Sequence, residues 1–167
     1  DAFSPHQELI ARRLTQLADL LSGARKLIII AVPTLFYRLP PASFIRDHSL
    51  HLHTGQKLGR EELTSLLITC GYERVSQVSE HGDFAVRGSL VDVYPTGMSS
   101  PVRVDFFDDE IETLRTFDPD SQLTLEQIDS LQTLPARDFP TEKEAISAFR
   151  GRYREHFQGN PAESLIY

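Results

Sequence analysis

The sequence has few of the residues that would favour a secreted or membrane-bound protein. Its 167 residues include one cysteine, one methionine and no tryptophan. A lone cysteine excludes an internal disulfide and favours a reducing, cytoplasmic setting. Because Cys70 falls on the apolar stripe of an expected helix, we predict a packing role for it. The richest apolar run, residues 27–32, is strand-length and too short to cross a bilayer.

Positive charge is also in the minority. Lys and Arg number 17 against 24 Asp and Glu, which gives a net charge of −7. This balance opposes binding to a phosphate backbone through bulk electrostatics, so a nucleic-acid site would need local clustering of basic residues. The chain starts at Asp1 rather than at a methionine and has no signal sequence, so we expect it to be a piece of a longer protein.

The first third of the sequence predicts part of an α/β domain. Ser4-Pro5 supplies an N-cap and a first-turn proline, and Gly23 closes the helix. The helical stripe consists of Ile10, Leu14, Leu17 and Leu21. Residues 26–32 (KLIIIAV) are apolar without alternation, which predicts a strand covered on both faces in a parallel sheet. Residues 33–47 hold three prolines and predict short helical turns packed on the sheet edge.

A second unit begins near Ser49, with a short strand at His51 and Leu52. A helix follows, and Gly71 ends it. Its stripe consists of Leu63, Leu66, Leu67 and Cys70. Alternating polarity with short turns then predicts an antiparallel meander. Its expected strands are residues 74–78, 84–87, 89–94, 102–107, 110–117 and 122–134.

The final unit opens at Pro135 and predicts one helix. Thr141 and Glu144 form a capping box at its start. Its apolar face consists of Ile146, Phe149, Tyr153 and Phe157. We expect this face to pack back on the α/β segment at the start of the chain. Arg150, Arg152 and Arg154 lie in its last turns, where they either complement the helix dipole or contact nucleic acid.

Residues 102–112 predict a hairpin with one apolar and one polar face. Alternation places Val102, Val104 and Phe106 on the face that can be buried. A two-residue turn at Asp108-Asp109 pairs Phe107 with Glu110 and sets Asp105 opposite Glu112. The same register pairs Arg103 with Leu114, Val104 with Thr113 and Phe106 with Ile111. Since two facing carboxylates are unfavourable, we expect a cation beside them, from Arg103 or Arg87.

The polar face therefore carries Arg87, Arg103, Asp105 and Phe107. The charges alone suit a solvated sheet surface with internal ion pairs. Phe107 changes this interpretation, because leaving a phenylalanine in water forgoes roughly 1.5–3 kcal/mol of burial. Arginine and aromatic side chains are typical anchors of protein interfaces. We predict a protein-docking site here, and we expect alanine at Arg103 or Phe107 to weaken docking while the fold stays intact.

Two motifs in this region resemble a known family. They are Arg87-Gly88 leading into residues 90–95 (LVDVYP), and residues 103–112 (RVDFFDDEIE). Together they resemble the UvrB-homology module of bacterial transcription-repair coupling factors, the Mfd family, and they are similar to the excinuclease subunit UvrB. The flanks FSPHQ at 3–7, LPA at 134–136 and FPT at 139–141 resemble the coupling factors rather than UvrB.

The resemblance implies an α+β fold, in which an antiparallel β-rich, UvrB-type domain 2 with a helix is inserted in an incomplete α/β helicase-like domain. The implied parts are residues 1–48 (domain 1a), 49–134 (the UvrA-binding domain 2) and 135–167 (the start of domain 1b). The partner implied is UvrA, the nucleotide-excision-repair ATPase, and the contact residues carried over are Arg87, Arg103, Asp105 and Phe107. RNA polymerase, DNA and the ATP-using motor are expected to engage other regions of the longer chain, and intramolecular contacts with those regions are expected too. We expect no cofactor in this fragment.

Enzymatic and other hypotheses have weaker support. The phosphate-binding loop G-x-x-x-x-G-K-[ST] is absent, and Thr54-Gly55-Gln56-Lys57 predicts a turn instead. The carboxylates from Asp105 to Glu112 would suit a hard cation, but turn-forming residues explain them more simply. His48, His51 and His53 include a pair on one strand face without a third or fourth zinc ligand. A DNA-binding or damage-sensing fragment, or a UvrB-type subunit fragment with a latent ATPase, remain the alternatives.

Overall fold

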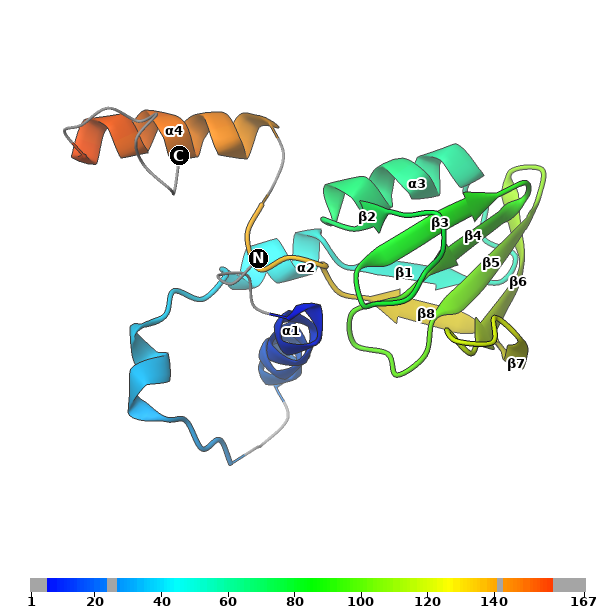
Figure 1. The fold of residues 1–167 in the computed structure, drawn as a ribbon, viewed down its shortest axis with the longest axis horizontal. Coiled ribbons are helices and arrows are strands. Elements are labelled where there is room, and N and C mark those ends of the chain that lie inside the picture. Colours follow the sequence, from blue (N-terminus) through cyan, green and yellow to red (C-terminus); the bar gives the residue numbers. More distant parts are fainter. Residues whose placement is uncertain (1–5, 24–26, 141–142, 158–167) are drawn as a thin grey trace.

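A computed structural model describes residues 6–23, 27–140 and 143–157 of the chain (Figure 1). Its largest part is a six-stranded sheet in which neighbouring strands follow the chain order β2-β3-β4-β5-β6-β7. The strands are β2 (Glu73–Arg74), β3 (Asp83–Arg87), β4 (Leu90–Val93), β5 (Val102–Phe107), β6 (Glu110–Phe117) and β7 (Thr124–Ile128). All pairs are antiparallel except β2–β3, which is parallel. The fold is α+β, as the sequence predicts.

A second, two-stranded sheet joins β1 (Leu50–His53) to β8 (Ser130–Thr133), antiparallel. Helix α3 (Arg60–Thr69) lies between β1 and β2 in the chain. The main hydrophobic core combines Leu63 and Leu67 of α3, Leu52 and Leu131 of the small sheet, and the apolar face of the large sheet. That face consists of Phe84, Val91, Val93, Val102, Val104, Phe106, Ile111 and Leu114.

The helix α3 ends as the sequence predicts. Cys70 is the C-cap and is buried, and Gly71 follows with a φ of 85°, in the left-handed region. A side chain at Gly71 would also come within 2.9 Å of Arg137 Cγ. The packing role predicted for Cys70 is confirmed, because the residue belongs to the main core.

Tyr72 joins three segments in the middle of the molecule. Its hydroxyl donates to the carbonyl oxygen of Leu134 at 2.8 Å and accepts from the backbone N–H of Thr96 at 3.0 Å. The hydroxyl of Thr133 is a further partner. Burial raises the pKa of Tyr72, since the charged phenolate would be poorly solvated there.

The segments outside these sheets pack less extensively. Helix α1 (Gln7–Leu21) and helix α2 (Ala42–Asp47) share a small apolar cluster of Ile10, Leu14, Ile45 and Leu134. A short 3₁₀ helix, η1 (Val32–Phe36), precedes α2, so the predicted helical turns are confirmed. Their expected packing on a sheet edge is wrong for η1, because Leu35 and Phe36 are 68% and 84% exposed. Gly23, at a φ of 74°, follows the last turn of α1 as predicted. Ser4-Pro5 and Thr141, the capping residues named above, lie outside the described residues.

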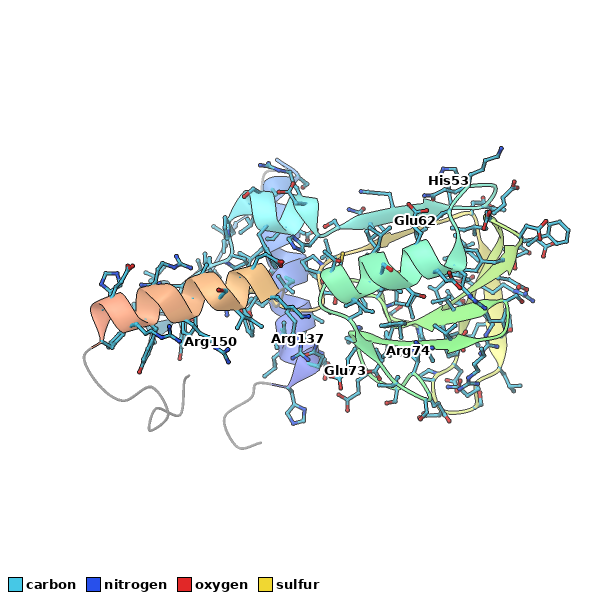
Figure 2. All side chains as sticks on the ribbon, turned by 90° about the horizontal axis from the view of Figure 1, so that it is seen from above. His53, Glu62, Glu73, Arg74, Arg137 and Arg150 are labelled. Carbon is cyan, nitrogen blue, oxygen red and sulfur yellow. The ribbon has the colours of Figure 1, made fainter. Side chains whose placement is uncertain are left out.

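Two expectations about the flanks are wrong. Residues 27–31 form no strand, and Leu27 and Ile29 are each 91% exposed. A buried strand needs partners on its edges and cover on both faces, and in the described ranges every strand belongs to one of the two sheets above. Helix α4 (Lys143–His156) does not bury its apolar face against the described residues at the start of the chain. It extends away from the sheets (Figures 1 and 2), and its described residues include no buried side chain.

The meander also differs from the prediction at its ends. The expected strand 74–78 is reduced to β2, and residues 75–80 instead lie over the polar face of the sheet, where Val78 packs with Ala85 and Phe117. The expected strand 122–134 is divided into β7 and β8, which belong to different sheets. Figure 2 labels Glu73 of β2 and Arg137, whose side chains form an ion pair at 3.5 Å.

Candidate protein-docking face

Strand register brings the four predicted site residues to one face of the large sheet. Arg87 pairs with Leu90, and Leu90 pairs with Asp105, so these three positions form one row across β3, β4 and β5. Arg103 and Phe107 are two residues before and after Asp105 on β5, and therefore share its face. Burial along β5 alternates in agreement with this placement. The core-facing residues Val102, Val104 and Phe106 are buried, whereas the three site residues are at least partly exposed.

Phe107 projects from the end of the β5–β6 hairpin and is 68% exposed. It pairs with Glu110 across a two-residue turn, as predicted, and Asp108 in that turn has a φ of 52°. The turn is held from the side by residues 55–58. The N–H of Gly55 donates to the carbonyl of Ile111 at 2.8 Å, and the N–H of Leu58 donates to that of Asp109 at 2.9 Å. The exposed ring of Phe107 thus projects from a hairpin whose turn is held in place by hydrogen bonds.

The register predicted for the rest of the hairpin is wrong. The pairing shifts between Asp105 and Phe106, so Asp105 lies opposite Thr113, and Glu112 is the extra residue of a β-bulge. Val104 then pairs with Leu114, and Arg103 pairs with Arg115 instead of Leu114. The shift removes the facing carboxylates that the regular ladder would have imposed.

Asp105 and Asp92 on the sheet face each form an ion pair with an arginine that the sequence did not predict. Asp105 accepts from Arg115 Nη2 at 2.9 Å and from the hydroxyl of Ser89 at 3.2 Å. Asp92, on β4, accepts from Arg103 Nε at 2.7 Å and from Arg103 Nη2 at 2.9 Å. The expected contacts of Arg103 with Glu112 and of Arg87 with the carboxylates are therefore wrong.

Arg103 is held on two sides. Its guanidinium carbon lies 4.7 Å from the centre of the Phe117 ring, within cation–π range, in addition to the two hydrogen bonds to Asp92. These hydrogen bonds raise the pKa of Arg103 further above its ordinary value. The Arg103 side chain is 17% exposed, whereas that of Asp92 is only 2% exposed. Arg103 is therefore a fixed cation at the surface, not a mobile one.

Arg87 has a different environment. Its Nη2 donates to the backbone carbonyl of Ser76 at 3.1 Å, and the residue is exposed. Ser76 belongs to the segment that covers the neighbouring part of the face. Arg87 consequently lies at the border between the covered and the open parts of the sheet.

A groove of about 790 Å³ adjoins Phe107 at the hairpin end. Its lining contains one lysine, Lys57, and five acidic residues, Glu62, Asp108, Asp109, Glu110 and Glu112. The surface beside the ring is therefore negative, in contrast to the arginine-bearing face behind it. Glu62 is labelled on α3 in Figure 2.

The sites considered as alternatives have ordinary structural surroundings. Thr54-Gly55-Gln56-Lys57 forms the turn after β1, as predicted, and Gly55 has a φ of 81°. His51 and His53 are exposed on β1, and His48 Nδ1 lies 2.9 Å from the carbonyl oxygen of Phe44. Over the described ranges, no group of three or more His, Cys, Asp or Glu side chains is arranged to hold a metal ion.

The three arginines of α4 do not form one stripe. At about 100° per residue, Arg150 and Arg154 share a side of the helix, whereas Arg152 points to the other side. Figure 2 labels Arg150 on this helix. In the part of the chain that the structure describes, no helix is long and apolar enough to span a membrane.

Comparisons with known proteins agree with this architecture. The family model for the UvrB interaction domain matches residues 50–139. A transcription-repair-coupling factor of Escherichia coli (strain K12) is 48% identical over 167 residues, which is 100% of this chain and 14% of that protein. The corresponding factor of Haemophilus influenzae is 43% identical over 157 residues, 94% of this chain and 14% of the relative.

A transcription-repair-coupling factor of Bacillus subtilis (strain 168) is 32% identical over 139 residues, 81% of this chain and 12% of the relative. The chain thus spans between 12% and 14% of the length of these three relatives. Because the family model covers more than half of the 167 residues, the chain belongs to the UvrB interaction domain family, in the form found in transcription-repair-coupling factors.

Proposed function

We propose that this chain is a non-catalytic docking module that binds UvrA through the sheet face of Arg87, Arg103, Asp105 and Phe107. Family membership and the resemblance of the two motifs support the partner. The observation that supports the location best is the 68% exposure of Phe107 on a hairpin braced by residues 55–58. An exposed ring on a rigid support is available for docking without a large ordering cost.

Recognition combines apolar burial with charge. Phe107 enters an apolar pocket of UvrA, which is worth roughly 1.5–3 kcal/mol for full burial of such a side chain. Arg103 and Arg87 face acidic groups of UvrA, and Asp105 faces a basic group or shares the cation of Arg115. Because Arg103 and Asp105 are already paired within the chain, they require little rearrangement on binding.

In the longer protein, the module would recruit repair to RNA polymerase stalled at a lesion. The translocase motor, its ATP and the contacts with polymerase and DNA belong to regions outside these residues, and the module would act in the cytoplasm. The division into residues 1–48, 49–134 and 135–167 remains part of this proposal.

A titration of purified UvrA with this chain tests the proposal. Phe107→Ala is expected to weaken binding by about tenfold or more, since interface anchors commonly contribute 2 kcal/mol or more. Phe139→Ala is the matched control, because Phe139 is also a well-exposed phenylalanine, 57% exposed, away from the hairpin. Equal affinities of wild type and Phe107→Ala would reject the assignment.

A further inference from the structure

The Asp92–Arg103 pair lies in surroundings that make it costly for stability alone. Asp92 is 1% exposed and lies opposite Ala85, while Phe117, at 0% exposed, lies under the guanidinium. Ala85 and Phe117 belong with Val78 to an apolar cluster. Removing a carboxylate from water costs several kcal/mol, and apolar side chains of similar volume often stabilise such a position equally well or better. The pair therefore calls for a role besides stability.

The geometry of the pair suggests that role. Asp92 accepts hydrogen bonds from Nε and Nη2 of Arg103, and these place one edge of the guanidinium against the sheet. The third nitrogen of Arg103, Nη1, has no hydrogen-bond acceptor in the described part of the chain. It is not one of the buried side-chain atoms that lack a partner there. The planar guanidinium is thus fixed by hydrogen bonds on one edge and by the Phe117 ring at one face, and its remaining donors are available at the surface.

We propose that Asp92 is a positioning residue, which orients Arg103 so that the free edge of the guanidinium can bind a carboxylate of the docking partner. Asp92 itself does not touch the partner, because its side chain is 2% exposed. This inference rests on the proposed function of the face. It assigns a role in docking to a residue that is too deeply buried to contact the partner itself.

Oriented donors discriminate by geometry as well as by charge. A guanidinium held in one plane offers two parallel N–H groups to a carboxylate, whereas a lysine offers a point charge. Arg103→Lys keeps the charge beside Asp92 and lets the chain fold with the carboxylate still paired. If orientation matters, this variant binds UvrA less well despite its unchanged charge.

The test is a double-mutant cycle on UvrA affinity, at a temperature where thermal melts show each variant to be folded. We expect Asp92→Asn and Arg103→Gln each to weaken binding about tenfold, and the double variant to be no weaker than Arg103→Gln, since coupled residues are not additive. We expect Arg103→Lys to lose at least about fivefold in affinity, the scale of one ordinary hydrogen bond. Asp83→Asn is the matched control, because Asp83 accepts from the N–H groups of Ser79 and Glu80 and does not contact Arg103.

The outcomes separate this inference from the proposed function. The positioning role would be overturned if Asp92→Asn or Arg103→Lys bound UvrA with full affinity. It would also be overturned if Asp92→Asn caused the same loss of affinity in the wild-type and the Arg103→Gln backgrounds. In each of these cases Phe107→Ala would still weaken binding, so the proposed function would stand. The proposed function would be overturned if the wild-type chain did not bind UvrA, or if Phe107→Ala bound UvrA with unchanged affinity. The inference about Asp92 would then be overturned as well.

Discussion

Asp105 accepts a hydrogen bond from Arg115 at 2.9 Å, a contact between β5 and β6 next to the β-bulge at Glu112. The bulge keeps Glu112 from lying opposite Asp105 and places an arginine near the carboxylate instead. In a regular ladder the two carboxylates would have repelled each other, whereas the bulge allows an ion pair on the candidate docking face.

Arg115→Gln should lower the free energy of unfolding by up to about 1 kcal/mol, because this pair is only partly buried and solvent screens it. Chemical denaturation of Arg115→Gln and of the control variant Arg12→Gln measures the effect. Arg12→Gln is the control, since Arg12 pairs with Glu8 with side chains 74% and 61% exposed, and it should change little. Equal losses in the two variants would show that the bulge does not favour the Asp105 pair.

Arg103→Ala should destabilise the chain strongly. Removal of one partner leaves the buried carboxylate of Asp92 unpaired, which typically costs about 3–5 kcal/mol. The expectation from sequence that this variant leaves the fold intact does not take that carboxylate into account. Urea denaturation of Arg103→Ala and of the double variant with Asp92→Ala measures the difference, and the double variant should regain part of the stability.

Tyr72→Phe should lower the free energy of unfolding by about 1–3 kcal/mol, because buried polar partners of the hydroxyl would lose their hydrogen bonds. The pKa of Tyr72 is raised in the folded chain, so its stabilising contribution is complete below pH 10.0, the ordinary value, and is lost as the pH rises beyond it. Denaturation between neutral and alkaline pH should therefore show a weaker alkaline loss for Tyr72→Phe. Tyr37→Phe, at a residue 67% exposed, should behave as wild type.

Asp118 should contribute to stability on the acid side. It accepts from both the N–H and the hydroxyl of Ser121 at 2.7 Å, and these hydrogen bonds lower its pKa below the ordinary 3.8. A lowered pKa in the folded chain gives stability above pH 3.8 that is lost as the pH falls through the folded value. Asp118→Asn should flatten the acid limb of a stability profile. An unchanged limb would show that the turn at Ser121 is not formed in solution.

The elements that the sequence predicted well depend on local signals. The helix before Gly71 and the strands around Val91 and Val104 follow from short-range periodicity and turn residues. Residues 26–32 follow the same rules but form no strand over their described part, because a strand of a buried sheet depends on neighbours that no local pattern supplies.

The candidate site was predicted at the level of the face but not of its contacts. Alternation was enough to group Arg103, Asp105 and Phe107. The bulge at Glu112 depends on how two strands twist together, and no single residue of the turn signals it. Asp92 did carry a signal, an isolated charge in the apolar strand LVDV, and strand order places it beside Arg103. That signal becomes informative only once the pairing of β4 with β5 is known.

The most direct test of the account is the dissociation constant of UvrA for wild type, Phe107→Ala and Phe139→Ala. We expect about a tenfold or greater loss of affinity for Phe107→Ala, with wild-type affinity and unchanged melting for the Phe139 control. Wild-type affinity for Phe107→Ala, in a chain shown to be folded, would contradict it.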